Sequence, residues 1–465
     1  MRTPLKGAIA ATVAVTTAFA MAGAADAAVN LNQVYTDQTP IRPAFSASGN
    51  VLGDVRPELV VTDYGDYQVV GGQPIIPPGA MYVYTNAHNA ANPGGPITKW
   101  KTVQVFGPDA GITFPSQPVL SDVDGDGDTD ILNGGGFFWD SFEGLNRGTL
   151  TWWENRGNGK FWDKHVIVEN SPWAYHSLQY VDFDGDGVKD IITVGEQGLD
   201  RMTHLDDLTE LQFHKGLGGG AFAPSEALAN RGGSNPVVYD VDGDGDLDVA
   251  SAQYFHVSQT TNFNQHLTGD ANFIWFERVG TDADGVDASD FVKHDISRLE
   301  GPSYGLFPAP NLYGDGVMRW IGTNHTNTTA GNPGPPIFLR AAPNAFVLTP
   351  GADPTQPWAV EPLADTYDAG AQWAANPRPG QAAPGKAVQG DYDRDGDIDV
   401  VISGDGDFRV MLIEQTAPGV FHQSVVPGSQ GWGQAGITTN DFNRDGRLEI
   451  AVSSFENQTV GIWTS

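Results

Sequence analysis

Acidic residues gather in five short windows of the chain, each immediately before an apolar run. The windows are SDVDGDGDTDIL from Ser121, VDFDGDGVKDII from Val181, YDVDGDGDLDVA from Tyr239, GDYDRDGDIDVV from Gly390 and NDFNRDGRLEIA from Asn440. Counted from the first acid, carboxylate or amide oxygens fall at positions 1, 3, 5 and 9, and glycine stands at position 6. Like charges at this spacing repel strongly unless a cation lies between them.

A hard cation that takes six to eight oxygen ligands is the natural occupant of such a loop, which predicts calcium. The expected ligands are Asp122, Asp124, Asp126, Asp130, Asp182, Asp184, Asp186, Asp190, Asp240, Asp242, Asp244, Asp248, Asp391, Asp393, Asp395, Asp399, Asp441, Asn443, Asp445 and Glu449. Because each set comes from one short loop, we expect the five ions to be structural rather than catalytic.

An EF-hand-type loop is excluded, because it requires a bidentate Glu at position 12. That position holds Asn133, Thr193, Ser251, Ile402 and Val452. The residues after position 9 are β-branched or small, as in Ile-Ile-Thr-Val and Val-Val-Ile-Ser, which predicts strands rather than helices. Each acidic loop therefore joins two strands.

Two weaker copies of the motif complete a series of seven. In the first, Asn50, Asp54 and Glu58 keep positions 1, 5 and 9. In the second, Asn311 and Asp315 remain, while Arg319 occupies position 9. The second copy is expected to lack a metal, with Arg319 supplying a fixed positive charge.

The seven loops begin 50 to 80 residues apart, a period typical of propellers and solenoids. Each unit contains four strand-like segments, the content of one propeller blade. The last unit, which stops at VGIWTS, is one strand short, and the segment VNLNQVYTD from Val29 would supply it. The sequence therefore predicts an all-β fold, a seven-bladed β-propeller at residues 29–465, with the ring closed by the N-terminal strand.

The D-x-D-G-D-G-x-x-D loops followed by apolar strands resemble the VCBS/FG-GAP repeats of integrin-alpha-like propellers. The resemblance implies a propeller of seven or eight blades, with calcium between the first and second strands of a blade. Members of this family include adhesion modules, fungal lectins, and lyases and dehydratases that act on sugars, so the fold leaves the function open.

On the face opposite the acidic loops, the sequence places aromatic residues among amides, histidines and charged residues, a composition suited to sugars. The candidate ligand-binding aromatic residues are Trp139, Trp173, Tyr304, Trp373 and Trp432. For each of them, packing against a blade edge is the alternative. Trp152, Trp153, Trp275 and Trp463 lie within strand patterns and are expected in the core.

Three histidines on that face, His176, His256 and His325, are candidate acid–base groups. A β-eliminating lyase or sugar dehydratase needs a base near a carbon-bound proton and a group that holds the acid or carbonyl. Tyr304 and Arg378 are candidates for these roles. His165, His294 and His422 recur near the end of the fourth strand, which favours a structural role.

The chain begins with Arg2 and Lys6 before an Ala-rich apolar stretch that ends in small residues. Residues 1–28 therefore have the pattern of a secretory signal peptide, which predicts an exported protein. The net charge of −32 disfavours nucleic acid and anionic membranes as partners, and no membrane insertion is expected. Without cysteine, an exported chain needs a staple other than disulfides, and bound calcium would provide it.

Three functions remain open at this point. The leading hypothesis is an exported, calcium-stabilised propeller that binds a carbohydrate or similar polar ligand opposite its metals. The second is a carbon–oxygen lyase or dehydratase acting on carbohydrate, and the third is a protein-adhesion module.

Overall fold

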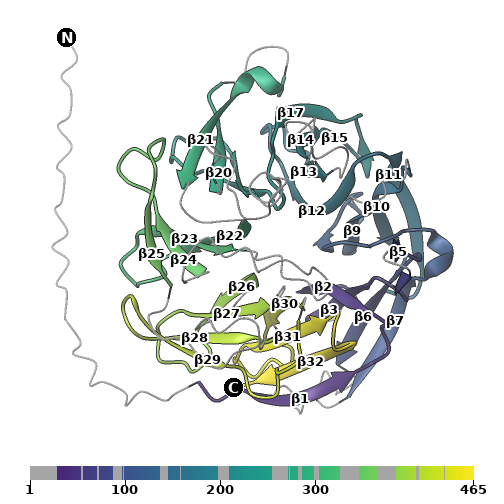
Figure 1. Cartoon of the computed structure of the whole chain (residues 1–465). Helices are drawn as coiled ribbons and strands as arrows, with labels where there is room; N and C mark the ends of the chain where they lie inside the picture. The colour runs from purple at the N-terminus through teal and green to yellow at the C-terminus, as the bar shows by residue number, and fades with distance from the viewer. Residues whose placement is uncertain are drawn as a thin grey trace, which may run out of the picture.

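The computed structural model describes residues 29–53, 56–66, 68–70, 73–86, 97, 99–136, 145–157, 159–196, 209–253, 271, 273–280, 285–297, 303–324, 345–363, 384–404, 408–433 and 435–465. Within this part of the chain, seven antiparallel four-stranded sheets surround a common axis, and the chain passes through them in order (Figure 1). The predicted all-β, seven-bladed propeller is confirmed.

The first four blades, in chain order and from inner to outer strand, are built as follows. They are β2 (Pro43–Gly49), β3 (Glu58–Asp63), β6 (Ala80–Asn86), β7 (Trp100–Phe106); β8 (Val119–Ser121), β9 (Asp130–Gly135), β10 (Gly148–Asn155), β11 (Trp162–Ser171); β12 (Ala174–Val181), β13 (Asp190–Glu196), β14 (Thr209–His214), β17 (Glu226–Asn230); and β18 (Val237–Tyr239), β19 (Asp248–Ala252), β20 (Phe273–Arg278), β21 (Phe291–Ser297).

The remaining three blades have the same build. They are β22 (Ser303–Pro310), β23 (Met318–Asn324), β24 (Ala345–Thr349), β25 (Ala359–Pro362); β26 (Pro384–Gly390), β27 (Asp399–Gly404), β28 (Met411–Ala417), β29 (Val420–Val425); and β30 (Ala435–Asn440), β31 (Glu449–Ser454), β32 (Thr459–Thr464), β1 (Asn32–Asp37). Two small hairpins, β4 (Gln68–Val70) with β5 (Gln73–Ile75) and β15 (Gly216–Gly218) with β16 (Ala221–Phe222), and two short 3₁₀ helices, η1 (Pro108–Ala110) and η4 (Ala288–Asp290), complete the described elements.

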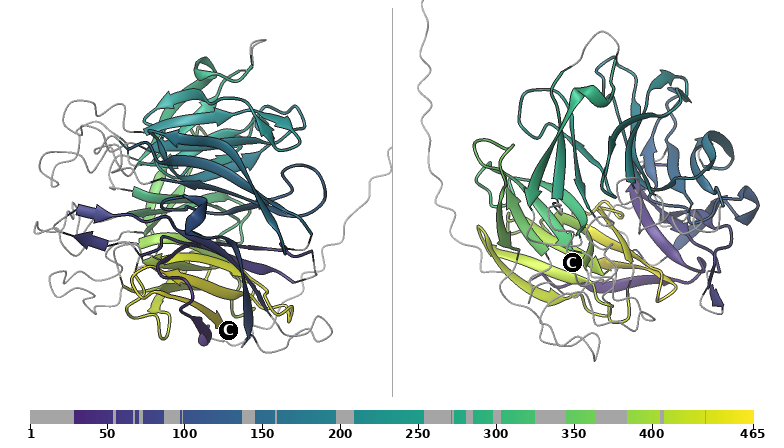
Figure 2. Two further views of the ribbon diagram at one scale, coloured as in Figure 1. Left: turned by 90° about the vertical axis from the view of Figure 1, so that its right-hand side faces the viewer. Right: turned by 45° about the horizontal axis from the view of Figure 1, so that its top comes forward.

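The seventh blade takes its outer strand from the start of the chain. β1 pairs antiparallel with β32, from Asn32 opposite Thr464 to Asp37 opposite Val460. Figures 1 and 2 both show the purple N-terminal strand beside the yellow C-terminal strands. This is the strand that the sequence assigned to the incomplete last unit.

Burial explains why each acidic loop precedes a continuous apolar run. The second strands β9, β13, β19, β27 and β31 are buried at every position, because each lies inside its sheet with neighbouring blades on both faces. The outer strands β7, β11, β17 and β25 alternate or are largely exposed. A strand that is buried on both faces has no polar side, so its sequence cannot alternate.

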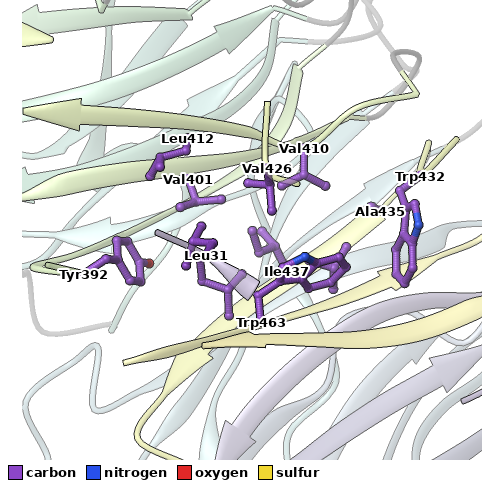
Figure 3. Packing of buried hydrophobic residues seen from close by; sticks show 12 residues of the cluster. Leu31, Tyr392, Val401, Val410, Leu412, Val426, Trp432, Ala435, Ile437 and Trp463 are labelled. Carbon is purple, nitrogen blue, oxygen red and sulfur yellow. The ribbon is translucent and has the colours of Figure 1, made fainter. Parts of the chain in front are cut away.

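The core consists of apolar layers between adjacent blades. Figure 3 shows the layer between the sixth and seventh blades, where Val401 and Leu412 meet Ile437 and Trp463, and Leu31 packs in from the residue before β1. The four tryptophans that were expected in the core are at most 5% exposed: Trp152, Trp153, Trp275 and Trp463.

Two of the three histidines expected to be structural, His165 and His294, repeat one arrangement on outer strands. His165 stacks on Trp152 with ring centroids 4.0 Å apart and bonds Glu154 at 2.7 Å. His294 lies against Trp275 at 4.8 Å and contacts Glu277 at 2.5 Å. Among the described residues, no helix is long and apolar enough to cross a membrane.

Candidate functional sites: acidic loops and a central cluster

The acidic loops fold so that their carboxylates converge. In four of them, one oxygen from each of three acids lies within 4.8 Å of the others, in the sets Asp122/Asp124/Asp130, Asp182/Asp184/Asp190, Asp240/Asp242/Asp248 and Asp391/Asp393/Asp395. In the first loop, Asp122 accepts bonds from the N–H groups of Gly125 at 2.8 Å and Gly127 at 3.0 Å, which closes the turn. Gly127, at position 6, has φ 96°, a left-handed conformation that glycine adopts without strain.

The acid at position 9 is buried and joins the loop to the sheet. Asp248 accepts one bond from the N–H of Val241 in its own loop, at 2.8 Å, and another from Arg278 at the end of β20, at 2.9 Å. Asp130, Asp190 and Asp399 make the same two kinds of bond, and Glu449 makes the one within the loop. The position-9 acid therefore fixes the loop whether or not it also coordinates an ion.

Burial raises the pKa of these position-9 acids, and the neighbouring carboxylates raise it further. The pKa is about 6 for Asp130, about 7 for Asp248 and Asp399, and about 8 for Glu449. A buried carboxyl group that is hard to ionise on its own is stabilised in its ionised form by a divalent cation beside it. The donor set consists of oxygens, which suits a hard cation rather than zinc or copper. The residues present therefore fit a metal ion. The fifth loop has Asn443 at position 3 and keeps the same turn, because the backbone N–H of Gly446 donates to Asp441 at 2.8 Å.

The two weaker loops keep the turn by other means. Arg319 makes a two-pronged ion pair with Asp315, at 2.6 and 2.8 Å, and its guanidinium carbon lies 3.9 Å from the centre of the Tyr313 ring. The fixed positive charge expected from Arg319 is therefore present. In the first blade, Glu58 accepts bonds from the N–H groups of Val51 and Leu52, while Asp54 lies outside the described residues.

A second group of residues lies at the opposite ends of the inner strands. We call it the central cluster: Phe45, Tyr64, Phe114, Gln117, His176, Glu196 and Lys386. Phe45, His176 and Lys386 stand near the start of β2, β12 and β26, and Glu196 ends β13. Since the acidic loops follow the last residue of each inner strand, the central cluster belongs to the other face of the ring.

The contacts of the central cluster form a closed circuit drawn from four blades. The Lys386 ammonium lies 4.6 Å from the centre of the Phe45 ring and donates to the side-chain oxygen of Gln117. The backbone N–H of Gln117 in turn donates to the backbone carbonyl of His176 at 3.4 Å. The aromatic rings complete the circuit, with centroid separations of 6.2 Å for Phe45–Tyr64, 3.6 Å for Tyr64–Phe114 and 6.3 Å for Phe114–His176.

Two titratable groups of the cluster have shifted pKa values. Burial alone would lower the pKa of His176, but the charge of Glu196 and the 2.5 Å hydrogen bond to it outweigh burial and raise it above 6.5. Burial lowers the pKa of Lys386 to about 7. Perturbed pKa values of this kind gather at functional sites.

Backbone strain is stored in the same place. Phe114 has φ 51°, in the left-handed region that a bulky side chain disfavours, and it precedes Pro115. Conformations of this kind cost about 1–3 kcal/mol and persist where the surroundings enforce them. Here the enforced result is the stack of Phe114 on Tyr64.

The described residues include four of the predicted ligand-face candidates. His176 lies in the cluster, although it is in β12 rather than in the between-blade loop expected from SPWAYHS. Trp173 is half-buried and packs over Gly195, beside Glu196. Tyr304 lies at the start of β22, and its backbone carbonyl accepts a hydrogen bond from the side-chain amide of Asn235 at 2.8 Å.

Trp432 corrects the sequence interpretation. It is 3% exposed and meets Trp463 edge-on at 5.0 Å, so its ring fills the core rather than offering a face to a ligand. Trp139, Trp373, Arg378, His256 and His325 lie outside the described residues.

Six residues of the central cluster were not predicted from the sequence: Phe45, Tyr64, Phe114, Gln117, Glu196 and Lys386. Lys386 and Gln117 are 269 residues apart and belong to no motif, so only the closed ring brings them together. Glu196 offered one signal, because it is a charged residue that follows the uncharged run Ile191–Gly195 in a second strand.

Comparison with known proteins agrees with the repeat architecture. A model of the FG-GAP-like repeat matches residues 122–193 and 391–452. No curated protein sequence matches the chain.

Similar solved structures include a lectin from Agrocybe aegerita that recognises non-reducing terminal N-acetylglucosamine, with 13% identity, coverage of 89% of this chain and 86% of the lectin, and a TM-score of 0.47. An exotype rhamnogalacturonan lyase has 12% identity, coverage of 91% and 72%, and a TM-score of 0.46. The BBS1N chain from a complex with ARL6DN has 9% identity, coverage of 93% and 96%, and a TM-score of 0.48. At these identities no activity is transferred from them, and the chain is a seven-bladed β-propeller with FG-GAP-like repeats in at least two regions.

Proposed function

We propose that the protein is an exported, calcium-stabilised propeller that binds a carbohydrate or similar polar ligand at the central cluster. The observation that carries this proposal is the circuit of contacts around Lys386, Gln117 and His176 on the face opposite the acidic loops. Aromatic rings can stack on the apolar faces of a sugar, while an amide and a cation bond its hydroxyls or carboxylate. The signal-peptide pattern of residues 1–28 supports export.

Calcium is the proposed cation because each loop offers several charged oxygens, and a backbone carbonyl and a water can complete the coordination shell. The ion would be held by the acids at positions 1, 3, 5 and 9, and the buried position-9 acid also ties the loop to the sheet. The role proposed for it is structural, since the loops and the central cluster are at opposite ends of the strands.

The direct test is a glycan-binding screen of the calcium-loaded full chain, followed by titration calorimetry with the best ligand. His176→Gln and Lys386→Met should each weaken binding at least tenfold. His165→Gln is the matched control, because His165 also pairs with a glutamate but lies on an outer strand. If the control and the two cluster variants weaken binding equally, or if no saccharide binds, the proposed function is wrong.

A second candidate, elimination at a uronic acid residue, is favoured by one observation. The cluster holds a His176–Glu196 pair and an amine whose pKa is about 7, and β-elimination needs a base for the carbon-bound proton and an acid for the departing oxygen. Polyuronates incubated with the protein would then develop the near-ultraviolet absorbance of an unsaturated product. Ligand binding without this absorbance would exclude elimination of the tested polyuronates and support the binding function.

A further inference from the structure

One of the five complete acidic loops contains a positive charge supplied by the chain. Lys215 follows β14 in the third blade, and its ammonium contacts Asp184 and also Asp186, the latter at 2.8 Å. These two acids are positions 3 and 5 of the loop at 182–190. The same pair of acids would be required by a metal ion in that loop.

Lys215 occupies a position that recurs in other blades, where the residue has the opposite charge. The position is defined by the backbone N–H that donates to the position-9 acid, since it is the residue directly before that donor. The donors are Gly216 to Asp190, Asn155 to Asp130, Arg278 to Asp248 and Gln415 to Asp399. The preceding residues are Lys215 in the third blade and Glu154, Glu277 and Glu414 in the second, fourth and sixth blades. The three glutamates add negative charge beside their loops, whereas Lys215 removes it.

The fifth blade reaches the same end by another route. Arg319 replaces the position-9 acid and holds both oxygens of Asp315, the acid at position 5. Asn311 still accepts the N–H of Gly316 at 2.7 Å, as Asp182 accepts that of Gly187 at 3.0 Å. The turn therefore survives where a guanidinium takes the place of an ion.

A divalent ion and a lysine ammonium cannot share Asp184 and Asp186 without strong repulsion at a few ångströms. To bind metal, the loop would have to release Lys215, which costs affinity because the tethered amine is always at hand. The other complete loops have no lysine or arginine contact of this kind to their position-3 and position-5 side chains in the described part of the chain.

We propose that the third and fifth blades are neutralised by their own cations, Lys215 and Arg319, and that the protein binds four divalent ions rather than five. The ions belong to the loops that begin at Asp122, Asp240, Asp391 and Asp441. The third and fifth blades therefore keep their loops ordered without metal.

The test is the number of calcium ions bound per chain, measured by native mass spectrometry and by calcium titration of the full chain. The wild-type protein should bind four ions. Lys215→Gln should bind a fifth ion, in the third-blade loop. Lys215→Glu restores the residue type of the other blades, and the affinity of its third-blade loop for calcium should be at least tenfold higher than that of the same loop in the wild-type chain. Lys189→Gln is the matched control, because Lys189 belongs to the same loop but donates to Ser121, and its loss should leave four ions.

Stability separates a filled site from an ordinary ion pair. Lys215→Gln should melt below wild type in chelator and recover in calcium, because an ion then replaces the amine. Five tight ions in the wild-type chain would overturn the proposal. A folded Lys215→Gln variant that still binds four ions, or one that melts equally low with and without calcium, would overturn it as well.

Discussion

Replacing Lys386 by methionine should stabilise the protein in a pH-dependent way. The lysine is 8% exposed, and its contacts among the described residues are an amide oxygen and a phenyl ring, neither of which carries a charge. Burial lowers its pKa from 10.5 to about 7. Between these two pH values the unfolded chain binds a proton that the folded chain does not, so the stability of the wild-type protein rises as pH rises through this window.

The size of the effect follows from the same numbers. The full difference corresponds to about 5 kcal/mol at about 1.4 kcal/mol per pH unit, an upper limit because water and local relaxation reduce it. We expect Lys386→Met to gain about 2 kcal/mol at pH 6, where the buried amine is charged, and almost nothing at pH 10, where the folded wild-type lysine is neutral. With unfolding entropy of about 2.1 cal/mol/K per residue, this is roughly 2 °C in melting temperature.

Differential scanning calorimetry in excess calcium, at pH 6 to 10, would measure both values. Lys164→Met is the control, because Lys164 is exposed and donates to a backbone carbonyl at the surface, so its loss should give no pH-dependent gain. A Lys386→Met variant that is less stable than wild type at every pH would refute the reasoning, as would a gain that does not change between pH 6 and 10. The stabilised variant should also lose ligand affinity, the expected trade between stability and function.

Three further predictions concern the metal loops and the histidine pair. Excess chelator should lower the melting temperature by roughly 10 °C, because each of four sites contributes about 2.7 kcal/mol when free calcium is about a hundred times the dissociation constant. Calorimetry with and without calcium would measure this shift, and a shift below about 2 °C would contradict a structural role for the metals. Asp248→Asn keeps the shape of the buried acid but turns an amide N–H₂ toward backbone donors. It should lower the free energy of unfolding by about 1–3 kcal/mol, measured by denaturant unfolding, and remove one calcium ion, measured by ion counting. An unchanged ion count would show that position 9 is not a ligand. His176→Gln should reduce ligand affinity at least tenfold while moving the melting temperature by less than 2 °C, and a large stability loss would instead make His176 a structural residue.

The fold was predictable because its information is local. In the five complete loops, the acid at position 9 accepts backbone N–H groups, and the strand after it is largely apolar because neighbouring blades cover both of its faces. These two requirements fall within about fifteen residues and recur with each blade. The same locality explains why Arg319 could be interpreted from the sequence, since its partner Asp315 is four residues away.

The central cluster was predictable only in part, because its contacts depend on ring closure. His176 was singled out from its neighbours in the chain, but its partner Glu196 is 20 residues away on the next strand, and Lys386 meets Gln117 across 269 residues. Trp432 misled for the opposite reason. Its glycine-rich surroundings resemble an exposed loop, yet the missing side chain of Gly461 leaves room for the indole, which a Cβ there would approach to 2.5 Å.

Each inner strand links the two faces of the ring, and this connection relates the metals to the ligand. β26 carries Lys386 near its start and leads at Gly390 directly into Asp391, while β12 carries His176 and leads at Val181 directly into Asp182. By the inference from Lys215, the second of these loops is ordered without calcium and the first is not. Calcium loss would therefore release the far end of the strand that positions Lys386 while the strand that positions His176 stays fixed. The ligand site would then respond to calcium through its cationic side, although no ion lies near it.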